Sequence, residues 1–370
     1  MTQSQLNADW ISPPSESIAR IAQINPEGLK EFLNLSSNNN IDGSGVVQNR
    51  VKITQIVATS LAISLGSTSE FWLERSRAYE EALTTRAQTL SGSLDTSIFE
   101  MDILSYFDHE FSRIEYGKND FEKILHFFAI GTADELTSKY LDFGVEVDFH
   151  TSQAYSSENG AIAVWIRSVE QKSIMQQVCE YNESALTLAI PEMRSLVKLR
   201  KPSLYFEKLK SILNRCGIRL VYLPHPKKCP VSGVLIRREN EPPTIAVTFR
   251  YLSDDHFWFT FFHEIGHLLD NNSATQNETI LLTEGEINSR ENFADEYAYR
   301  VLIPENLEKA LQKVALNKKA VIRLAIQNQL SPGIVVGQLQ HMKRIPMSWM
   351  NGLKRRYTRS MLSSLLNESL

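Results

Sequence analysis

Apolar residues recur along this chain with two different periods, and the change between them lies near residue 218. In segments such as 14–24, 54–66 and 69–87 the apolar residues stand about three or four positions apart, which is typical of amphipathic helices. From 218 to 249 they come in short runs rich in Val, Ile and Leu (IRLVYL, SGVLIRRE and TIAVTF), which are typical of strands. The pattern therefore predicts an α+β protein that is mostly helical and has a small β-sheet.

A polar, turn-rich stretch and the change in period divide the chain into three segments. The stretch 89–97 (TLSGSLDTS) is rich in turn-forming residues, so we place a domain boundary there. We expect residues 1–90 to form a helical domain, residues 91–200 a helical connecting region, and residues 201–370 a domain that contains the strands and further helices. Within the last domain, the polar stretch 271–290 is long for a loop, and we expect a flap there.

The helix predicted from 254 to 269 has polar residues within a strongly apolar sequence. In FTFFHEIGHLLDN, His263 and His267 are four residues apart, so their side chains lie on the same face of a helix. This spacing lets two imidazoles bind one metal ion, and Glu264 stands beside them as the general base of the HExxH pattern. The alternative is a pair of buried histidines that only form hydrogen bonds. The preceding strands and a carboxylate further along the chain favour the metal site.

A carboxylate for the third ligand position stands on the next predicted helix. A catalytic zinc site needs three protein ligands and one open position. Glu291 begins ENFAD, and Asp295 lies one turn later on the same face. We therefore expect Glu291 to bind Zn²⁺ and Asp295 to accept a hydrogen bond from the far nitrogen of His263, which fixes the orientation of that imidazole. The rival carboxylates are Glu284, Glu286 and Glu296.

Small residues predict that these two helices pack closely. Gly266 costs about 1 kcal/mol in a helix relative to alanine, so a close contact at that position would explain its presence. Ala294 and Ala298 on the second helix are small enough to allow the same close approach. Close packing of the two helices beneath the metal site would explain Gly266, and so would a packing contact elsewhere.

Composition and charge are ordinary for a globular protein. Hydrophobic residues make up 42% and charged residues 22% of the 370 residues, and the net charge of −4 does not favour a polyanionic partner. The N-terminal sequence lacks the pattern of a signal peptide, and no apolar run has the length of a membrane span. The three cysteines are few and widely spaced, as in the reducing cytoplasm. We expect a cytoplasmic protein without a membrane partner.

One cysteine has two interpretations. Cys229 precedes the strand that should border the cleft of the metal site. A thiolate there could bind zinc and keep the enzyme inactive, whereas a buried cysteine more commonly acts as a small apolar residue.

Several blocks of the last segment resemble the ImmA/IrrE family of metallo-endopeptidases. The resemblance covers roughly residues 203–357, in the blocks VSGVLIRRENEPPTIAVTFRY, DDHFWFTFFHEIGHLLD, ENFADEYAYRVLIP, SPGIVVGQLQH and NGLKRRY. It implies a minimal, gluzincin-like zincin fold with His263, His267 and Glu291 as zinc ligands and Glu264 as general base. It also implies a protein substrate, because members of the family are linked to cleaving repressors of mobile elements or stress genes. This chain has Tyr297 where phenylalanine is usual.

The segment 52–83 resembles the end of Cro/C1-type (XRE) helix-turn-helix domains of the HigA-like antitoxin group. The matching sequence is KITQIVATSLAISLGSTSEFWLERSRAYEEAL. The resemblance implies that residues 1–90 form a helix-turn-helix-like domain whose DNA-reading helix lies within residues 35–51. The polar side chains there that could contact base edges are Asn38, Asn39, Asn40 and Gln48.

The expected reading helix departs from the pattern of that group. Gly43 and Gly45 weaken a helix, and no Lys or Arg occurs between Glu31 and Arg50. Residues 1–90 contain seven Lys and Arg and nine Asp and Glu, a balance of 7 − 9 = −2, whereas DNA binding draws its affinity from phosphate neutralisation. The domain could therefore bind DNA, or it could be a dimerisation module that forms a homodimer, or a module that recognises another protein.

Three hypotheses for function follow. The first is a zinc-dependent endopeptidase that cleaves a regulatory protein such as a transcriptional repressor and is targeted by its N-terminal domain. The second is a DNA-binding regulator, antitoxin-like, in which the peptidase domain acts as a sensor. The third is an interaction scaffold with a decayed site. The complete HExxH motif favours the first hypothesis over the third.

Overall fold

The computed structural model describes most of the chain and divides it into two compact units. It describes residues 12–39, 41–47, 51–91, 115–117, 119–130, 132–141, 157–173, 176, 178–224, 229–238, 241–270, 278–282 and 289–367. The described residues up to Ser173, together with Cys229, belong to the first unit, and the others from Gln176 onward form the second. The described part of the chain contains no helix long and apolar enough to cross a membrane.

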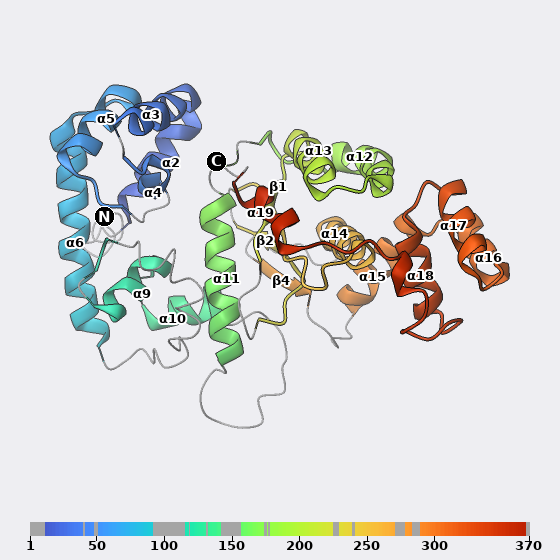
Figure 1. Cartoon of the computed structure of the whole chain (residues 1–370). Helices are drawn as coiled ribbons and strands as arrows, with labels where there is room; N and C mark the ends of the chain where they lie inside the picture. The colour runs from blue at the N-terminus through green and yellow to red at the C-terminus, as the bar shows by residue number, and fades with distance from the viewer. Residues whose placement is uncertain are drawn as a thin grey trace. The chain divides into compact units, whose positions relative to one another are not determined.

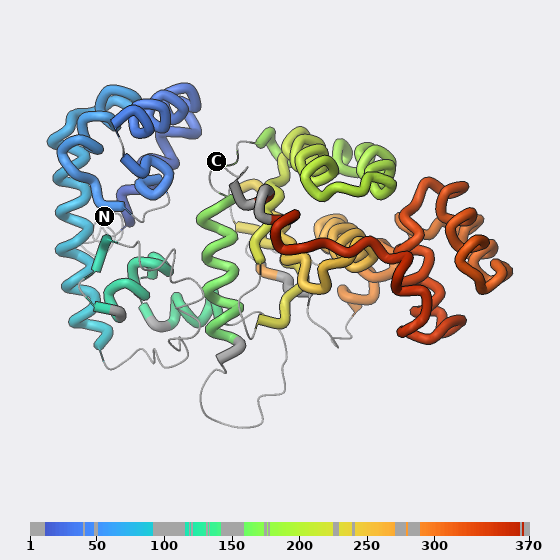
Figure 2. The backbone as a smooth tube through the Cα atoms, viewed as in Figure 1, coloured from blue at the N-terminus to red at the C-terminus, as the bar shows by residue number. Residues whose placement is uncertain are grey.

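The first unit is built from helices (Figures 1 and 2). Its helices are α2 (Pro14–Ile24), α3 (Pro26–Asn38), α4 (Gly43–Val47), α5 (Gln55–Leu65), α6 (Ser69–Leu90), α9 (Asp120–Phe128), α10 (Ala133–Leu136), the π-helix η1 (Thr137–Leu141) and α11 (Ser157–Ser173). The core of α2 to α6 includes Ile18, Phe32, Leu61 and Trp72, none of which is exposed to solvent. Helix α6 is the long helix that runs along this unit in Figure 2.

The second unit combines helices with a four-stranded sheet. Its helices are α12 (Glu183–Ser195), η2 (Leu196–Lys198), α13 (Pro202–Arg215), α14 (Asp254–Leu269), α15 (Ser289–Leu302), α16 (Glu305–Lys313), α17 (Lys318–Gln327), α18 (Pro332–His341), η3 (Asn351–Leu353) and α19 (Arg359–Asn367). Its strands are β1 (Arg219–Tyr222), β2 (Gly233–Arg237), β3 (Thr244–Val247) and β4 (Glu278–Leu282). The mostly helical α+β class is confirmed.

The division of the chain differs from the three segments expected from the sequence. Helix α12 lies within the expected connecting region 91–200, but Leu186 and Met193 of this helix are fully buried in the same core as α13. The second unit therefore begins at Gln176, because these apolar side chains join its core.

The sheet has the strand order β1-β3-β2-β4. Strands β2 and β3 form an antiparallel pair, with Gly233 opposite Val247. Strand β1 pairs with β3 in parallel. Helix α14 packs against β2, β3 and β4, so the sheet supports the helix that carries the two histidines (Figure 1).

The stretch 271–290 contains a strand, so the expectation of a loop throughout was wrong. Strand β4 lies in the middle of this stretch and pairs with β2 in antiparallel register, with Leu282 opposite Gly233. Backbone hydrogen bonding to β2 incorporates these residues into the edge of the sheet. The expected flap on either side of β4 lies outside the described residues.

The N-terminus of α14 is held by a buried carboxylate. Asp254 is completely buried and accepts hydrogen bonds from the hydroxyl of Ser331 and the backbone N–H of Arg355, the latter at 3.0 Å. A Cβ atom on Gly333 would lie 2.4 Å from an oxygen of Asp254, so only glycine leaves room for this contact. Burial raises the pKa of Asp254 to about 6 despite these hydrogen bonds. Asp254 thus connects α14 with two later segments.

Helices α14 and α15 pack closely at Gly266, as the small residues predicted. A Cβ atom at Gly266 would lie 2.9 Å from the Cα atom of Ala294 and 3.2 Å from Cβ of Tyr297. Ala294 and Ala298 are both fully buried. The two backbones therefore meet at a position where any larger side chain would force them apart.

We predict that Gly266→Leu destabilises the protein by about 1–3 kcal/mol, because the added side chain overpacks the contact with Ala294. The midpoint of thermal unfolding should fall by about 2–4 °C for each kcal/mol. Differential scanning calorimetry of the full chain measures this change. Gly352→Leu is the matched control, because nothing lies within 4 Å of a Cβ atom at that exposed position. Equal midpoints for both variants would contradict the tight contact.

Candidate metal centre

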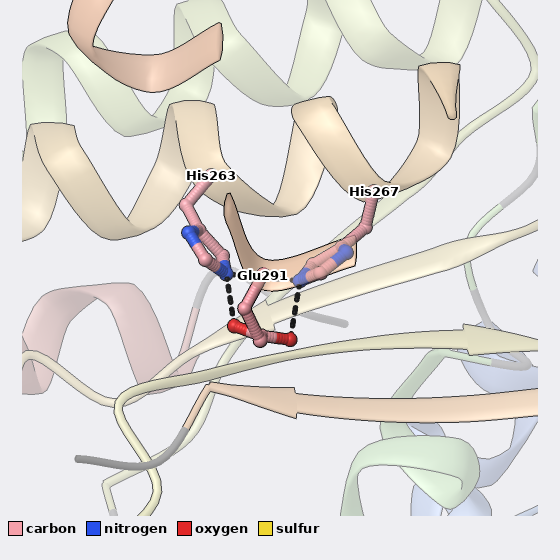
Figure 3. A group of neighbouring side chains, drawn as sticks. All are labelled: His263, His267 and Glu291. Atoms are coloured by element: carbon pink, nitrogen blue, oxygen red, sulfur yellow. Dashed lines mark hydrogen bonds and ion pairs between the residues drawn. The ribbon is translucent and has the colours of Figure 1, made fainter. Parts of the chain in front are cut away.

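Two histidines of α14 and one glutamate of α15 converge on a single point (Figure 3). Nε2 of His263 lies 3.1 Å from Oε2 of Glu291, and Nε2 of His267 lies 3.1 Å from Oε1 of the same carboxylate. The two Nε2 atoms are 2.9 Å apart. The side chains of both histidines are fully buried, and that of Glu291 is 8% exposed. The three residues predicted as metal ligands therefore lie together.

The distances between the two Nε2 atoms and the carboxylate oxygens of Glu291 fit three ligands of one tetrahedrally coordinated ion. Ligand atoms about 2.0–2.1 Å from a zinc ion at tetrahedral angles would lie about 3.3 Å from one another. The observed separations of 2.9 and 3.1 Å are close to this value. Two imidazole nitrogens and a carboxylate form a donor set that suits a divalent transition metal. The group could therefore bind a metal ion.

Asp295 orients one of the histidines. Its carboxylate oxygen Oδ1 lies 2.8 Å from Nδ1 of His263, as the sequence predicted. Because Nδ1–H donates to Asp295, the other nitrogen, Nε2, keeps its lone pair for a metal ion. Nδ1 of His267 is buried and has no hydrogen-bond partner among the described residues. Hydrogen bonding to a carboxylate therefore fixes the ring of His263.

The pKa values of His263 and Glu291 depend on the interactions between these side chains and their neighbours. Burial disfavours the charged form of His263, but its hydrogen bonds to Asp295 and Glu291 outweigh that effect and raise its pKa to about 9. Burial also disfavours the charged form of Glu291, yet the two histidines lower the pKa of this carboxyl to about 2. In the absence of metal, positive charge on His263 therefore stabilises the carboxylate of Glu291. A metal ion can replace that positive charge.

Glu264 is positioned differently from the three ligands. It is completely buried, and neither of its carboxylate oxygens has a hydrogen-bond partner among the described residues. Burial raises its pKa to about 8. A buried carboxyl without a partner is costly for stability, which is typical of a group retained for chemistry.

Gly233 makes room for Glu264, and the sequence analysis missed this role. A Cβ atom on Gly233 would lie only 2.5 Å from Oε1 of Glu264 and 2.7 Å from Cγ2 of Thr260. The signal in the sequence was a glycine at the start of a strand, which often marks a close approach of another group.

The other candidate ligands are not part of this group. Glu296 is bound to Arg300 at 2.6 Å, and its side chain is 60% exposed. Cys229 is buried and is not in the metal-ligand group found among the described residues, which supports its structural interpretation. Glu284 and Glu286 lie outside the described residues.

Within the described residues of the segment 35–51, α3 ends at Asn38 and α4 begins at Gly43, so no single helix covers the expected reading segment. Asn38 is the last residue of α3 and Asn39 follows it, and both are exposed. Helix α4 has only five residues, and a Cβ atom on its Gly43 would clash with Ser36 at 2.6 Å. The other candidate DNA contacts, Asn40 and Gln48, lie outside the described residues.

Comparisons of the chain with protein-family models, curated proteins and solved structures found no match. Any functional conclusion therefore depends on the residues of the metal centre and their geometry.

We predict that His263→Ala and Glu291→Ala each abolish tight binding of added Zn²⁺, because each removes one of three protein ligands. Asp295→Ala should weaken the affinity by about 10–100-fold, since it only orients His263. Competition with a chromogenic chelator measures the affinities. Glu296→Ala is the control and should bind Zn²⁺ like the wild type. If Glu291→Ala binds normally while Glu296→Ala does not, the third ligand is misassigned.

Proposed function

We propose that this protein is a zinc-dependent endopeptidase that cleaves a regulatory protein. The observation that carries the proposal is the buried carboxyl of Glu264 beside a His263, His267 and Glu291 group of metal-binding geometry. The three ligands alone would also suit a structural metal site. The additional unpartnered carboxylate on the same helix favours hydrolysis.

The donor set favours zinc as the metal. Two imidazoles and one carboxylate are the ligands of many hydrolytic zinc sites, and three protein ligands leave a fourth position open. Structural zinc sites are usually closed by four protein ligands, often cysteines. The three cysteines of this chain do not belong to the ligand group found among the described residues.

Each residue of the site has a distinct role in the proposed hydrolysis. A zinc ion would supply a Lewis acid that polarises the peptide carbonyl and lowers the pKa of water toward about 7. Glu264 accepts a proton from the attacking water and passes it to the nitrogen of the leaving amine. Its pKa, raised by burial, would be lowered again by a nearby cation, which keeps it in the range of a base at neutral pH. Asp295 holds His263 in the orientation that binding requires.

The protein substrate is proposed from the sequence blocks that resemble the ImmA/IrrE metallo-endopeptidases. These blocks correspond to β2, β3, α14, α15 and α18, the elements that form and surround the metal centre. We propose a repressor or another transcriptional regulator as the substrate class, and a gluzincin-like relationship for this unit. Helices α2 to α6 would then direct the peptidase to its substrate, as a helix-turn-helix-like module that recognises a protein or DNA.

We predict that Glu264→Gln keeps the zinc and lowers peptidase activity by about 10²–10⁴-fold, because it removes the proton acceptor and leaves the three ligands intact. Metal analysis and quantitative proteomics of cells carrying the variant test this together. The substrate should accumulate in those cells. Glu305→Gln, at an exposed position on α16 where the residue pairs with Lys309, is the matched control and should behave like the wild type.

The same variant separates the peptidase from a sensor. If Glu264→Gln binds zinc and supports the normal biological response, the domain senses rather than cleaves, and the proposal is wrong. A regulator that responds to a ligand of the metal centre would not need a proton acceptor.

We predict that the full chain binds DNA with an affinity no tighter than about 1 µM at physiological salt, in the range of non-specific binding. Residues 1–90 have a net charge of −2, and no Lys or Arg occurs between Glu31 and Arg50 to neutralise phosphates. Fluorescence anisotropy with duplexes from the native promoter region, over a salt series, measures the affinity. Tight and specific binding that Asn38→Ala and Asn39→Ala weaken would overturn this prediction.

A further inference from the structure

A cleft of about 1000 Å³ lies in the second unit between α14, α15 and α18. One continuous face of α15 borders it, because Asn292, Asp295, Glu296, Tyr299 and Leu302 recur at helical spacing. Large apolar side chains make up much of the wall. They include Phe259, Tyr299, Leu302, Ile334, Met342 and Met347.

The cleft adjoins the metal centre. Asp295 lies in its wall and also binds Nδ1 of His263 at 2.8 Å. Thr260 lies in its wall too, one helical turn before Glu264. The space that Gly233 leaves is shared by Thr260 and Glu264. A ligand that binds at the metal centre can therefore extend a side chain into this cleft.

The charges in the wall favour an apolar occupant. Asp255 forms an ion pair with Lys354 at 2.6 Å, and both side chains are buried. Glu296 pairs with Arg300. With Asp295 bound to His263, each carboxylate that lines the cleft already has a partner. Oδ1 of Asp255 has no hydrogen-bond partner among the described residues, but Lys354 balances the charge of this carboxylate, so the wall has little uncompensated negative charge to attract a basic side chain.

Three buried polar atoms in the wall have no hydrogen-bond partner among the described residues: Oδ1 of Asp255 and the side-chain oxygens Oε1 of Gln338 and Gln340. Gln338 of α18 is 9% exposed and lines the cleft, and its side-chain oxygen Oε1 has no hydrogen-bond partner among the described residues. Ligand pockets commonly combine apolar walls with a few such polar groups, which fix the orientation of the ligand. This oxygen can accept a hydrogen bond from an amide N–H.

We propose that the cleft is the subsite that binds a large apolar side chain of the substrate, next to the bond that is cleaved, and that Gln338 binds a neighbouring amide N–H. This inference rests on the proposed peptidase function. It narrows the substrate to a segment with a residue such as leucine, methionine or phenylalanine beside the cleavage site. Ile334, Met342 and Met347 provide the part of the wall that determines this preference.

Peptide hydroxamates test the subsite without requiring catalysis. A hydroxamate chelates the metal and carries an adjacent side chain and amide. The zinc-loaded full chain is titrated by calorimetry with three hydroxamates that differ only in that side chain: isobutyl, hydrogen or carboxymethyl. The isobutyl compound should bind about 10- to 100-fold more tightly than the hydrogen compound, because it buries a leucine-sized apolar group.

Each outcome has a separate meaning. Equal affinities for all three compounds, or tightest binding of the carboxymethyl compound, would overturn the apolar subsite while leaving the metal centre in place. If none of the three binds to the zinc-loaded chain, the metal centre is not accessible to a peptide, and the proposed function fails together with the subsite.

Variants locate the preference within the cleft. Ile334→Trp should fill the cleft and remove the advantage of the isobutyl compound while the hydrogen compound binds as before. Ile326→Trp, at a position on α17 that is 68% exposed, is the matched control and should keep the advantage. If Ile334→Trp does not fold, Met347→Ala at an exposed position serves instead and should reduce the advantage about three-fold. An unchanged advantage in these two variants would place the subsite elsewhere.

The role of Gln338 has its own test. Gln338→Met should weaken all three hydroxamates by about the same factor, roughly 2- to 10-fold, because it removes an acceptor for the shared amide. The ratio between the isobutyl and hydrogen compounds should stay the same. Unchanged affinities would remove Gln338 from the subsite.

Discussion

The close approach of α14 and α15 at Gly266 is the constraint on which the metal centre depends. Two ligands stand on one helix and the third on the other, so their separation is set by the distance between the two backbones. Because a Cβ atom at Gly266 would meet Ala294 at 2.9 Å, a larger residue would move Glu291 away from the histidines. Metal sites tolerate ligand displacements of only about 0.2 Å. The packing of two small residues thus determines whether three side chains can share an ion.

The same pair of helices borders both the candidate metal centre and the apolar cleft. Asp295 orients His263 through one carboxylate oxygen and also lies in the wall of the apolar cleft. The face of α15 that borders the cleft begins one residue after Glu291. A shift of α15 would therefore change the metal geometry and the shape of the cleft together. An occupant of the cleft and an ion at the centre would stabilise the same arrangement of helices.

Much of the centre could be predicted from the sequence, because helical periodicity relates residues that are near one another in the chain. The spacing of His263 and His267, and that of Glu291 and Asp295, required only the geometry of a single helix. Strand β4 was missed although its sequence, ETILL, contains three consecutive apolar residues, because these residues are flanked by polar ones and their pairing depends on β2. The cleft could not be predicted from the sequence either, because α18 lies beside α14 only through tertiary contacts between distant parts of the chain.

The buried carboxylate of Asp254 determines when, during synthesis of the chain, the N-terminus of α14 can acquire its tertiary contacts. Its hydrogen-bond partners, Ser331 and Arg355, follow it by 77 and 101 residues in the chain. During synthesis on a ribosome, α14 therefore emerges long before the groups that fix its N-terminus. Contacts between such distant residues form late, because the intervening chain must first be ordered. A nascent chain thus lacks the contacts that hold the N-terminus of α14, the helix that carries two of the candidate metal ligands, until residue 355 has been released.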